Sequence, residues 1–378
     1  MTVAIQSVSA ITAAELPALA AGSQLLGCGG GGYTAQELWA LQRRGEDLRA
    51  TIAPLDSSFG TCALVGYVGS TLVLAEELPS GQELSTAVFA LERWTGRKVT
   101  SVLPAEIGGV IALASVDLSA QAHLPVVDAD GIGRSTPRLD QLAPLHGSSQ
   151  PVSGAVVTPT GLVSVVDTRG PDALETALRD IAAHNGGWGG FAIGPFDEAT
   201  VRERAVPGTI SRAVALGSDL LQVRSQASSI PLSAAPLGWV PIRGRVLDVQ
   251  HETSAVSFVR GSAAIQDLTT GQVARIEMGS EYLYLAVDGE PAASAPDCIC
   301  VLGMRDLTPI NTDDIRSGMY VEVLVLETPR PLGGLSLPVP AEYGLPFEPV
   351  RFDARRIPEQ EHPATSVHLS AGGHNATR

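Results

Sequence analysis

The order of apolar and polar positions divides the first half of the chain into alternating helices and buried strands. Apolar residues that recur every three or four positions predict amphipathic helices, whereas short continuous runs of apolar and β-branched residues predict buried strands. Thr12 and Glu15 have the spacing of a capping box and predict a helix start. The expected helices are 11–26, 34–45, 84–96, 109–123 and 171–186, and the expected strands are 62–69, 71–78, 98–104 and 124–130.

The pattern changes near Pro151. Residues 154–168 predict a hairpin, and beyond Pro231 short β-rich runs follow one another with only turns between them. We therefore predict an α/β N-terminal domain with a three-layer, largely parallel sheet, joined to a β-rich, barrel-like C-terminal domain. The predicted boundaries are 1–165 for the first domain and 166–354 for the second, mixed and then β-rich, with a disordered polar tail at 355–378.

Composition and charge restrict the class of protein. Hydrophobic residues make up 44% of the chain and charged residues 17%, which is typical of a folded globular protein. A formal net charge of −15 leaves no basic surface for a nucleic acid. No run reaches the roughly 18 apolar residues of a membrane span, and four scattered cysteines do not indicate a disulfide framework. We expect a cytoplasmic homo-oligomer that acts on a small molecule.

A glycine-rich stretch, QLLGCGGGGY, surrounds Cys28. Glycine costs roughly 0.5–1 kcal/mol relative to alanine inside a regular element, so such a run is useful where φ is positive or where a neighbour comes very close. Gly29, Gly30, Gly31 and Gly32 therefore predict a packing turn or a ligand-binding nest. The run also matches the dinucleotide pattern G-x-G-x-x-G, but no buried strand is predicted before it. Cys28 itself is either a nucleophile or a small packing residue.

Carboxylates follow two of the predicted strands. Glu106 lies between a strand and a helix, where it could cap the helix or contact a ligand. Asp128 and Asp130 follow the next strand, and Arg134 can reach back toward them. Such a group can do acid–base chemistry, polarise a carbonyl, bind a metal, or form a structural Asp–Arg turn. We predict no cofactor, and a divalent metal on Asp128 and Asp130 stays open.

Several strings resemble one family in their order along the chain. They are LLGCGGGG, VGS with AEELPSGQE, PAEIGGVIAL and LPVVDADGIGRSTPRL, followed by PGTISRAVALG, GRVLDV, EYLYLAVDGE and APDCICVLG. Over about Ala10 to Phe352 the chain resembles the S-methyl thiohydantoin desulfurase-like family. It departs from the family pattern at Glu77, where Lys is common, and at Tyr282, where Asn or an acidic pair is usual.

The resemblance implies an α/β domain joined to a barrel-like domain, and hydrolysis of an S-methylated thiohydantoin to a hydantoin with release of methanethiol. Members often accompany hydantoinase or oxoprolinase-type enzymes, so a hydantoinase-type partner is expected. The alternatives are a non-catalytic accessory subunit of such a complex and a dinucleotide-dependent oxidoreductase. We expect a site in the cleft between the domains, with catalytic Asp128, Asp130, Glu106 and Cys28 and with substrate-binding Gly29, Gly30, Gly31, Gly32, Ser70 and Arg134.

Overall fold

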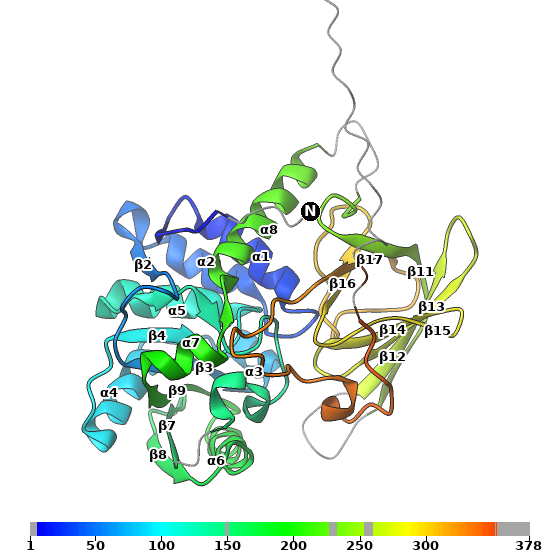
Figure 1. The fold of residues 1–378 in the computed structure, drawn as a ribbon. Helices are drawn as coiled ribbons and strands as arrows, with labels where there is room; N and C mark the ends of the chain where they lie inside the picture. The colour runs from blue at the N-terminus through cyan, green and yellow to red at the C-terminus, as the bar shows by residue number, and fades with distance from the viewer. Residues whose placement is uncertain (1–5, 148–150, 227–232, 253–259, 352, 354–378) are drawn as a thin grey trace, which may run out of the picture.

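Two large sheets organise the chain, and each belongs to its own domain (Figure 1). The structure is a computed structural model that describes residues 6–147, 151–226, 233–252, 260–351 and 353. An eight-stranded mixed sheet with a parallel centre is flanked by helices, and a seven-stranded antiparallel sheet curls strongly into a half-barrel. This confirms the predicted combination of an α/β domain and a β-rich domain. The predicted tail, 355–378, lies outside the described residues.

The first sheet is parallel only at its centre. Its strands, in spatial order, are β1 (Ala10–Thr12), β2 (Arg49–Ala53), β5 (Val126–Val127), β4 (Ser101–Pro104), β3 (Cys62–Gly69), β9 (Trp188–Phe196), β7 (Val152–Val157) and β8 (Val163–Thr168). The pairings from β2 to β3 are parallel, whereas β1 at one end and β9, β7 and β8 at the other are antiparallel. The hairpin expected at 154–168 is the β7–β8 pair. Strands from both sides of position 165 thus share one sheet, and the predicted domain boundary stays a prediction.

Helices cover both faces of this sheet and make three layers. Consecutive strand residues point to opposite faces, so Leu64 and Val65 belong to different apolar clusters. One face packs against α1 (Leu16–Leu26), α2 (Thr34–Gln42), α4 (Glu83–Thr95), α5 (Val110–Ala122) and α8 (Thr209–Ser225). The other face packs against α6 (Pro171–His184) and α7 (Glu198–Arg204). Helices α1 and α8 come very close because Gly22 and Gly217 leave no room for a side chain between them.

One predicted strand is wrong. Residues 71–78 were expected to be a strand because they are apolar, but they contain the short helix α3 (Thr71–Glu76). The Ser70 hydroxyl accepts a hydrogen bond of 3.3 Å from the Val73 N–H and so caps the helix. Leu74 is the only residue of this helix that is buried, and Leu72 is half-exposed. A short apolar run can form either element, and here the N-terminal cap decides.

The second sheet is antiparallel throughout. Its order is β15 (Glu290–Ser294), β14 (Tyr282–Val287), β13 (Val273–Met278), β12 (Arg260–Asp267), β11 (Trp239–Glu252), β17 (Tyr320–Leu326) and β16 (Cys298–Gly303). Strand β14 also contacts β16, although four other strands lie between them in this order. The sheet therefore curls back toward itself around its own apolar core. The remaining elements are the β6–β10 pair (Ala129–Asp130, Val206–Pro207) and the 3-10 turns at Gly45–Asp47, Leu139–Gln141, Ala143–Leu145 and Pro340–Tyr343.

The two domains share part of their cores. Leu25 and Leu26 at the end of α1 belong to the same apolar cluster as Cys298, Cys300 and Leu324 of the curled sheet. Backbone hydrogen bonds also cross the junction, because the Cys28 carbonyl accepts from the Tyr282 N–H at 2.8 Å. The glycine run is therefore one of the segments that join the two domains. In the part of the chain that the structure describes, no helix has the length and apolar character needed to cross a membrane.

Candidate functional site

The glycine run follows helix α1 and lies against the C-terminal domain. Gly29, Gly31 and Gly32 have positive φ values of 86°, 74° and 80°, which residues with a Cβ rarely adopt. Gly30 has no positive φ, but a Cβ there would lie 2.8 Å from Cγ of Glu281. A Cβ on Gly29 would lie 2.5 Å from the ring of Tyr282. Glycine is therefore needed here for two reasons: the backbone is left-handed at three positions, and side chains of the C-terminal domain come very close to it.

The element before the glycine run excludes a dinucleotide turn of the usual kind. That site requires a strand, the glycine turn and then a helix, so that the pyrophosphate meets the helix N-terminus. Here the run comes directly after helix α1, whose backbone continues into it through the hydrogen bond from Gly27 N–H to the Ser23 carbonyl. The glycine run therefore matches G-x-G-x-x-G in sequence but lacks the preceding strand that a dinucleotide site requires. The oxidoreductase alternative loses the motif on which it rested.

A cavity of about 210 Å³ lies beside the glycine run, between the domains. It opens at the carboxyl ends of the parallel strands β3 and β4, where ligands bind in open α/β sheets. Its walls are Gly29–Gly32, the segment from Tyr67 to Leu72, Glu106, the segment from Thr136 to Leu139, Arg179, and Ser280, Glu281, Asn311 and Asp313 of the C-terminal domain. Both domains thus supply polar side chains to one cavity.

The structure separates the predicted site residues into two groups. Gly29, Gly30, Gly31, Gly32, Ser70 and Glu106 line the cavity. Among the described residues that form its walls, Cys28, Asp128, Asp130 and Arg134 do not appear. The β4 loop reaches the cavity through Glu106, and the loop after β5 reaches it through Thr136–Leu139. Asp128, Asp130 and Arg134, which were expected there, are engaged elsewhere, as follows.

Glu106 is the predicted carboxylate that faces the cavity. Its Oε2 accepts a hydrogen bond of 2.7 Å from the Thr136 N–H, and its Oε1 accepts one of 3.2 Å from the Ser135 hydroxyl. Burial raises the pKa of Glu106 well above its usual range, and the carboxyl of Glu281 raises it further. It does not cap α5, which begins after Gly109 without a side-chain cap. Its alternative role as a helix cap is therefore not seen.

Asp128 and Asp130 brace the backbone around the site. Asp128 accepts hydrogen bonds from the N–H and the hydroxyl of Ser211, at 3.0 and 2.6 Å, near the start of α8. Asp130 accepts from the N–H groups of Ile107 and Gly133, at 2.7 and 2.8 Å, and burial raises its pKa to about 7. Protein donors thus occupy both carboxylates, an arrangement that does not suit metal ligands, and no cluster of three metal-binding side chains occurs among the described residues.

Arg134 holds the domains together. It is fully buried, and its guanidinium donates to the carbonyls of Ser135, Tyr282 and Asp297 at 3.1, 2.9 and 2.9 Å. Two of these carbonyls belong to the curled sheet and its β15–β16 turn. The residue expected to bind substrate is therefore a link between the domains.

Cys28 is a packing residue in this geometry. Its side chain is fully buried, and its thiol donates to the Leu26 carbonyl at 3.4 Å. Burial raises the pKa of the Cys28 thiol well above its usual range, with Cys298 and Cys300 of β16 close by. Reactive cysteines have lowered pKa values and some solvent access, so the structure favours the packing interpretation over the nucleophile.

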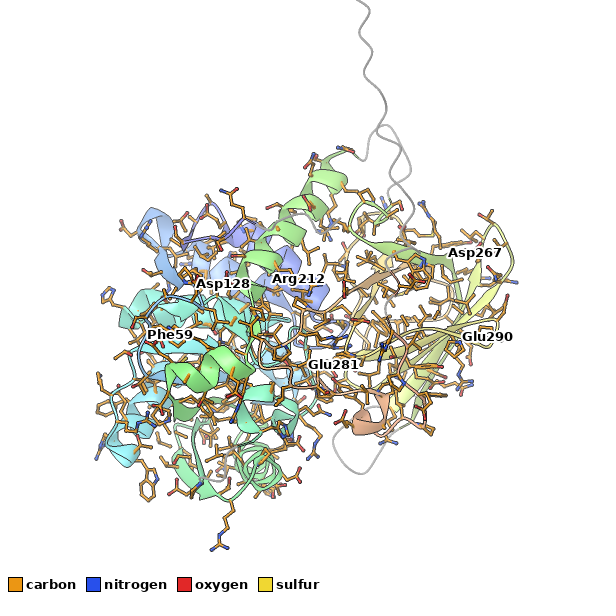
Figure 2. The ribbon with its side chains drawn as sticks, in the orientation of Figure 1. Phe59, Asp128, Arg212, Asp267, Glu281 and Glu290 are labelled. Atoms are coloured by element: carbon orange, nitrogen blue, oxygen red, sulfur yellow. The ribbon has the colours of Figure 1, made fainter. Side chains whose placement is uncertain are left out.

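A buried glutamate and a pair of arginines beside the cavity were not singled out from the sequence. Glu281 lies at the domain junction in Figure 2, at the start of β14. It occurs in the string EYLYLAVDGE, where a carboxylate directly before an apolar strand was the available signal. Burial raises the pKa of Glu281 to about 8, and Arg134 and Arg179 counteract part of that rise.

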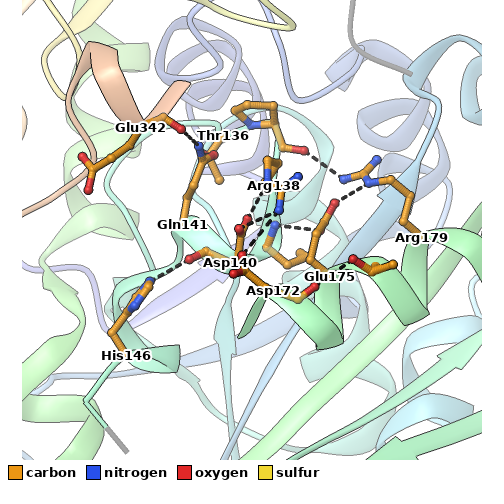
Figure 3. Close-up of polar contacts among 12 residues, drawn as sticks. Thr136, Arg138, Asp140, Gln141, His146, Asp172, Glu175, Arg179 and Glu342 are labelled. Carbon is orange, nitrogen blue, oxygen red and sulfur yellow. Dashed lines mark hydrogen bonds and ion pairs between the residues drawn. The ribbon is translucent and has the colours of Figure 1, made fainter. Parts of the chain in front are cut away.

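The pair of arginines, Arg138 and Arg179, forms an arginine wall on one side of the cavity (Figure 3). Arg138 makes a bidentate pair with Asp140, at 2.8 and 2.7 Å. Arg179 binds the Glu175 carboxylate and donates to the Pro137 carbonyl at 2.9 Å. These contacts hold both guanidinium groups in place, so the wall can meet a carbonyl or carboxylate oxygen of a ligand.

Comparisons with known proteins cover nearly the whole chain. The family model described as "S-Me-THD-like, N-terminal domain" matches residues 14–168, and the model described as "S-Me-THD-like, C-terminal domain" matches residues 169–351. A crystal structure of a protein from Chromobacterium violaceum has a TM-score of 0.68 and 23% sequence identity, over 85% of this chain and 92% of that one. At this identity the likeness concerns the fold. No curated protein matches the chain.

Proposed function

The chain belongs to the S-Me-THD-like family, and from this premise we propose that it is a hydrolase of a small cyclic ureide-like substrate such as an S-methyl thiohydantoin. In the proposed reaction, water adds to the C=N carbon that carries the methylthio group. The carbon–sulfur bond then breaks, methanethiol leaves and a hydantoin remains. The family, whose name abbreviates S-methyl thiohydantoin desulfurase, supports the reaction class.

The observation that carries the proposal is the buried Glu106 carboxyl on the wall of a small polar cavity. Addition of water to a C=N bond needs a group that takes a proton from water and a group that gives one to nitrogen. A carboxyl whose pKa is raised by burial exchanges protons near neutral pH more readily than an exposed one. The cavity, about 210 Å³, is smaller than the roughly 300–1,000 Å³ of sites for drug-sized ligands. A single substituted ring is therefore the favoured ligand.

The geometry favours activated water over a covalent intermediate. Cys28 is the sulfur nucleophile that the sequence offers, and its thiol is buried behind the glycine run with a raised pKa. Glu106 lines the cavity with its carboxyl held by two donors. We therefore assign the acid–base role to Glu106 and a packing role to Cys28.

The first prediction tests this function directly. The purified chain is incubated with a panel of S-methyl thiohydantoins and hydantoins, and released methanethiol is measured with a thiol reagent. We expect methanethiol from at least one S-methyl thiohydantoin, and a loss of about 10²–10⁴-fold in kcat for Glu106→Gln, because glutamine cannot exchange the proton. Absence of turnover across the panel would overturn the proposal and favour an accessory subunit.

A further inference from the structure

Two glutamates from different domains line the cavity beside the glycine run. Glu106 follows β4 of the first domain, and Glu281 precedes β14 of the second. Their side chains are almost fully buried, with 7% and 2% exposure. A Cβ on Gly30 would meet Glu281, and a Cβ on Gly31 would meet the Ser135 hydroxyl that binds Glu106. Glu281 therefore lies against Gly30, and Glu106 is linked to the neighbourhood of Gly31 through Ser135.

The hydrogen bonds of the two carboxyls differ. Both oxygens of Glu106 accept hydrogen bonds, from Ser135 and Thr136, and these donors offset part of the rise in its pKa that burial and the Glu281 carboxyl cause. Oε2 of Glu281 is buried and has no hydrogen-bond partner within the described chain. An unpaired buried charge is costly, so the missing partner favours the protonated form of Glu281, a residue of the cavity wall. Repulsion between the two groups also disfavours the doubly charged pair.

We propose that Glu281 is a second catalytic carboxyl, which donates a proton to the ring nitrogen while Glu106 takes a proton from the attacking water. The inference rests on the proposed function, because it assigns a role in that reaction. It also explains why the cavity is built between two domains. Each domain holds one carboxyl, so neither domain alone has the complete proton-transfer pair.

The proposed steps balance in atoms and electrons. Water forms the new C–O bond, Glu106 takes one of its protons, and the C=N electron pair moves to nitrogen, which takes the proton of Glu281. In the second step Glu281 takes the proton of the new hydroxyl as the C=O bond forms. The C–S bond breaks, and sulfur leaves as methanethiol with the proton held by Glu106. Both carboxyls return to their first state, and no oxidant or reductant is needed.

Charged and titratable groups from both domains surround Glu281. They are Arg134 and Arg179, which lower its pKa, Glu106 and Tyr343, which interact with it electrostatically, and Arg138 and Asp313 on the wall of the same cavity. With burial as the dominant effect, the pKa of Glu281 is about 8. A proton donor loses its proton as the pH rises through its pKa. We therefore expect kcat to fall as the pH rises through about 8.

The test compares Glu281→Gln with a matched control, Glu322→Gln. Glu322 is also fully buried, and its Oε2 likewise has no partner among the described residues, but it lies in β17 and does not line the cavity. We expect Glu281→Gln to lose about 10²–10⁴-fold in kcat with little change in KM or melting temperature, because glutamine keeps the shape but not the proton. We expect Glu322→Gln to keep the wild-type kcat. The alkaline fall should be absent from the residual activity of Glu281→Gln.

Different outcomes identify which proposal fails. If wild type releases methanethiol and Glu281→Gln keeps its kcat, the inference about Glu281 is overturned and the proposed function stands. If wild type releases none, infrared spectroscopy still tests the proton: a protonated-carboxyl band should be lost in Glu281→Gln and should titrate near pH 8. Absence of such a band overturns the inference. If Glu281→Gln does not fold, a wild-type kcat that stays constant through pH 8, or a wild-type band that does not titrate, overturns it.

Discussion

At the scale of single residues, burial and hydrogen bonding separate carboxylates that look alike in the sequence. Asp128 and Asp130 each accept two or more hydrogen bonds from protein donors away from the cavity. Glu106 and Glu281 lie on its wall, and burial raises the pKa of both. The residue type permits acid–base chemistry at all four positions. The surroundings favour it at two of them.

A single methyl group at Gly30 should displace Glu281. The φ of Gly30 is not positive, so alanine meets no backbone strain, but its Cβ would lie 2.8 Å from Glu281 Cγ. We expect Gly30→Ala to cost about 1–3 kcal/mol in the free energy of unfolding, as overpacked sites do. We also expect kcat to fall, because the carboxyl can relieve the contact only by moving. Chemical denaturation and the methanethiol assay measure the two effects.

Gly170 is the control for that substitution. It precedes α6 with φ of −172°, and no described atom lies within 4 Å of a Cβ built there. Gly170→Ala should leave the free energy of unfolding and kcat close to wild type. Equal behaviour of the two alanine variants would show that the contact at Gly30 is not tight in solution.

At the scale of elements, strand ends and helix starts are tied by carboxylates. Asp128 connects the end of β5 to α8, because Ser211 donates to it through both its N–H and its hydroxyl. Asp130 connects the β6 residues to the loop that carries Glu106, through the Ile107 N–H. Their place at a strand end predicts catalytic roles for both residues. Their contacts instead indicate that they position the loops around the cavity.

The substitution Asp128→Asn separates these two roles. Asparagine places an N–H₂ group against donors, so we expect a loss of about 1–3 kcal/mol in the free energy of unfolding. We expect kcat to change less than the roughly 10²-fold typical of a lost acid–base group. Asp219→Asn, at an exposed position of α8, is the matched control and should change neither quantity. A 10²-fold loss of kcat with unchanged stability would restore the catalytic hypothesis.

At the scale of the whole molecule, the cavity exists because the domains are docked. The apolar cluster around Leu25 includes residues of the curled sheet, and backbone hydrogen bonds join the glycine run to Tyr282 and Thr312. Arg134 adds a buried guanidinium that binds the Tyr282 and Asp297 carbonyls. Loss of this docking would separate Glu106 from Glu281.

Replacing Arg134 by methionine should therefore affect stability and activity together. Methionine fills much of the volume but leaves three backbone carbonyls without their donor. Each unsatisfied buried group costs about 1–3 kcal/mol, so we expect a loss of at least about 2 kcal/mol and a large decrease in kcat. Calorimetry and the methanethiol assay provide the measurements. A stable, fully active variant would show that the domains dock without this contact.

The sequence by itself determined most of the helices and strands and the position of the glycine run. Periodicity marked α4, α5 and α6 and the buried strands β3 and β4, because local patterns of apolar residues specify which face is buried. The glycine run and Glu106 were also recognisable, since a glycine cluster and a carboxylate at a strand end have local signatures. The family resemblance came from the same local strings, and the family models confirm it.

The tertiary structure decided which side chains meet. Residues 71–78 became a helix because Ser70 caps it, although an apolar run alone suits either element. Glu281 lines the same cavity as Glu106 only after the curled sheet docks on the glycine run, so contacts between positions far apart in the chain place it there. Asp128, Asp130 and Arg134 acquired protein partners by the same long-range packing. Local patterns carry no information about such partners, because burial and pKa depend on what the folded chain brings alongside.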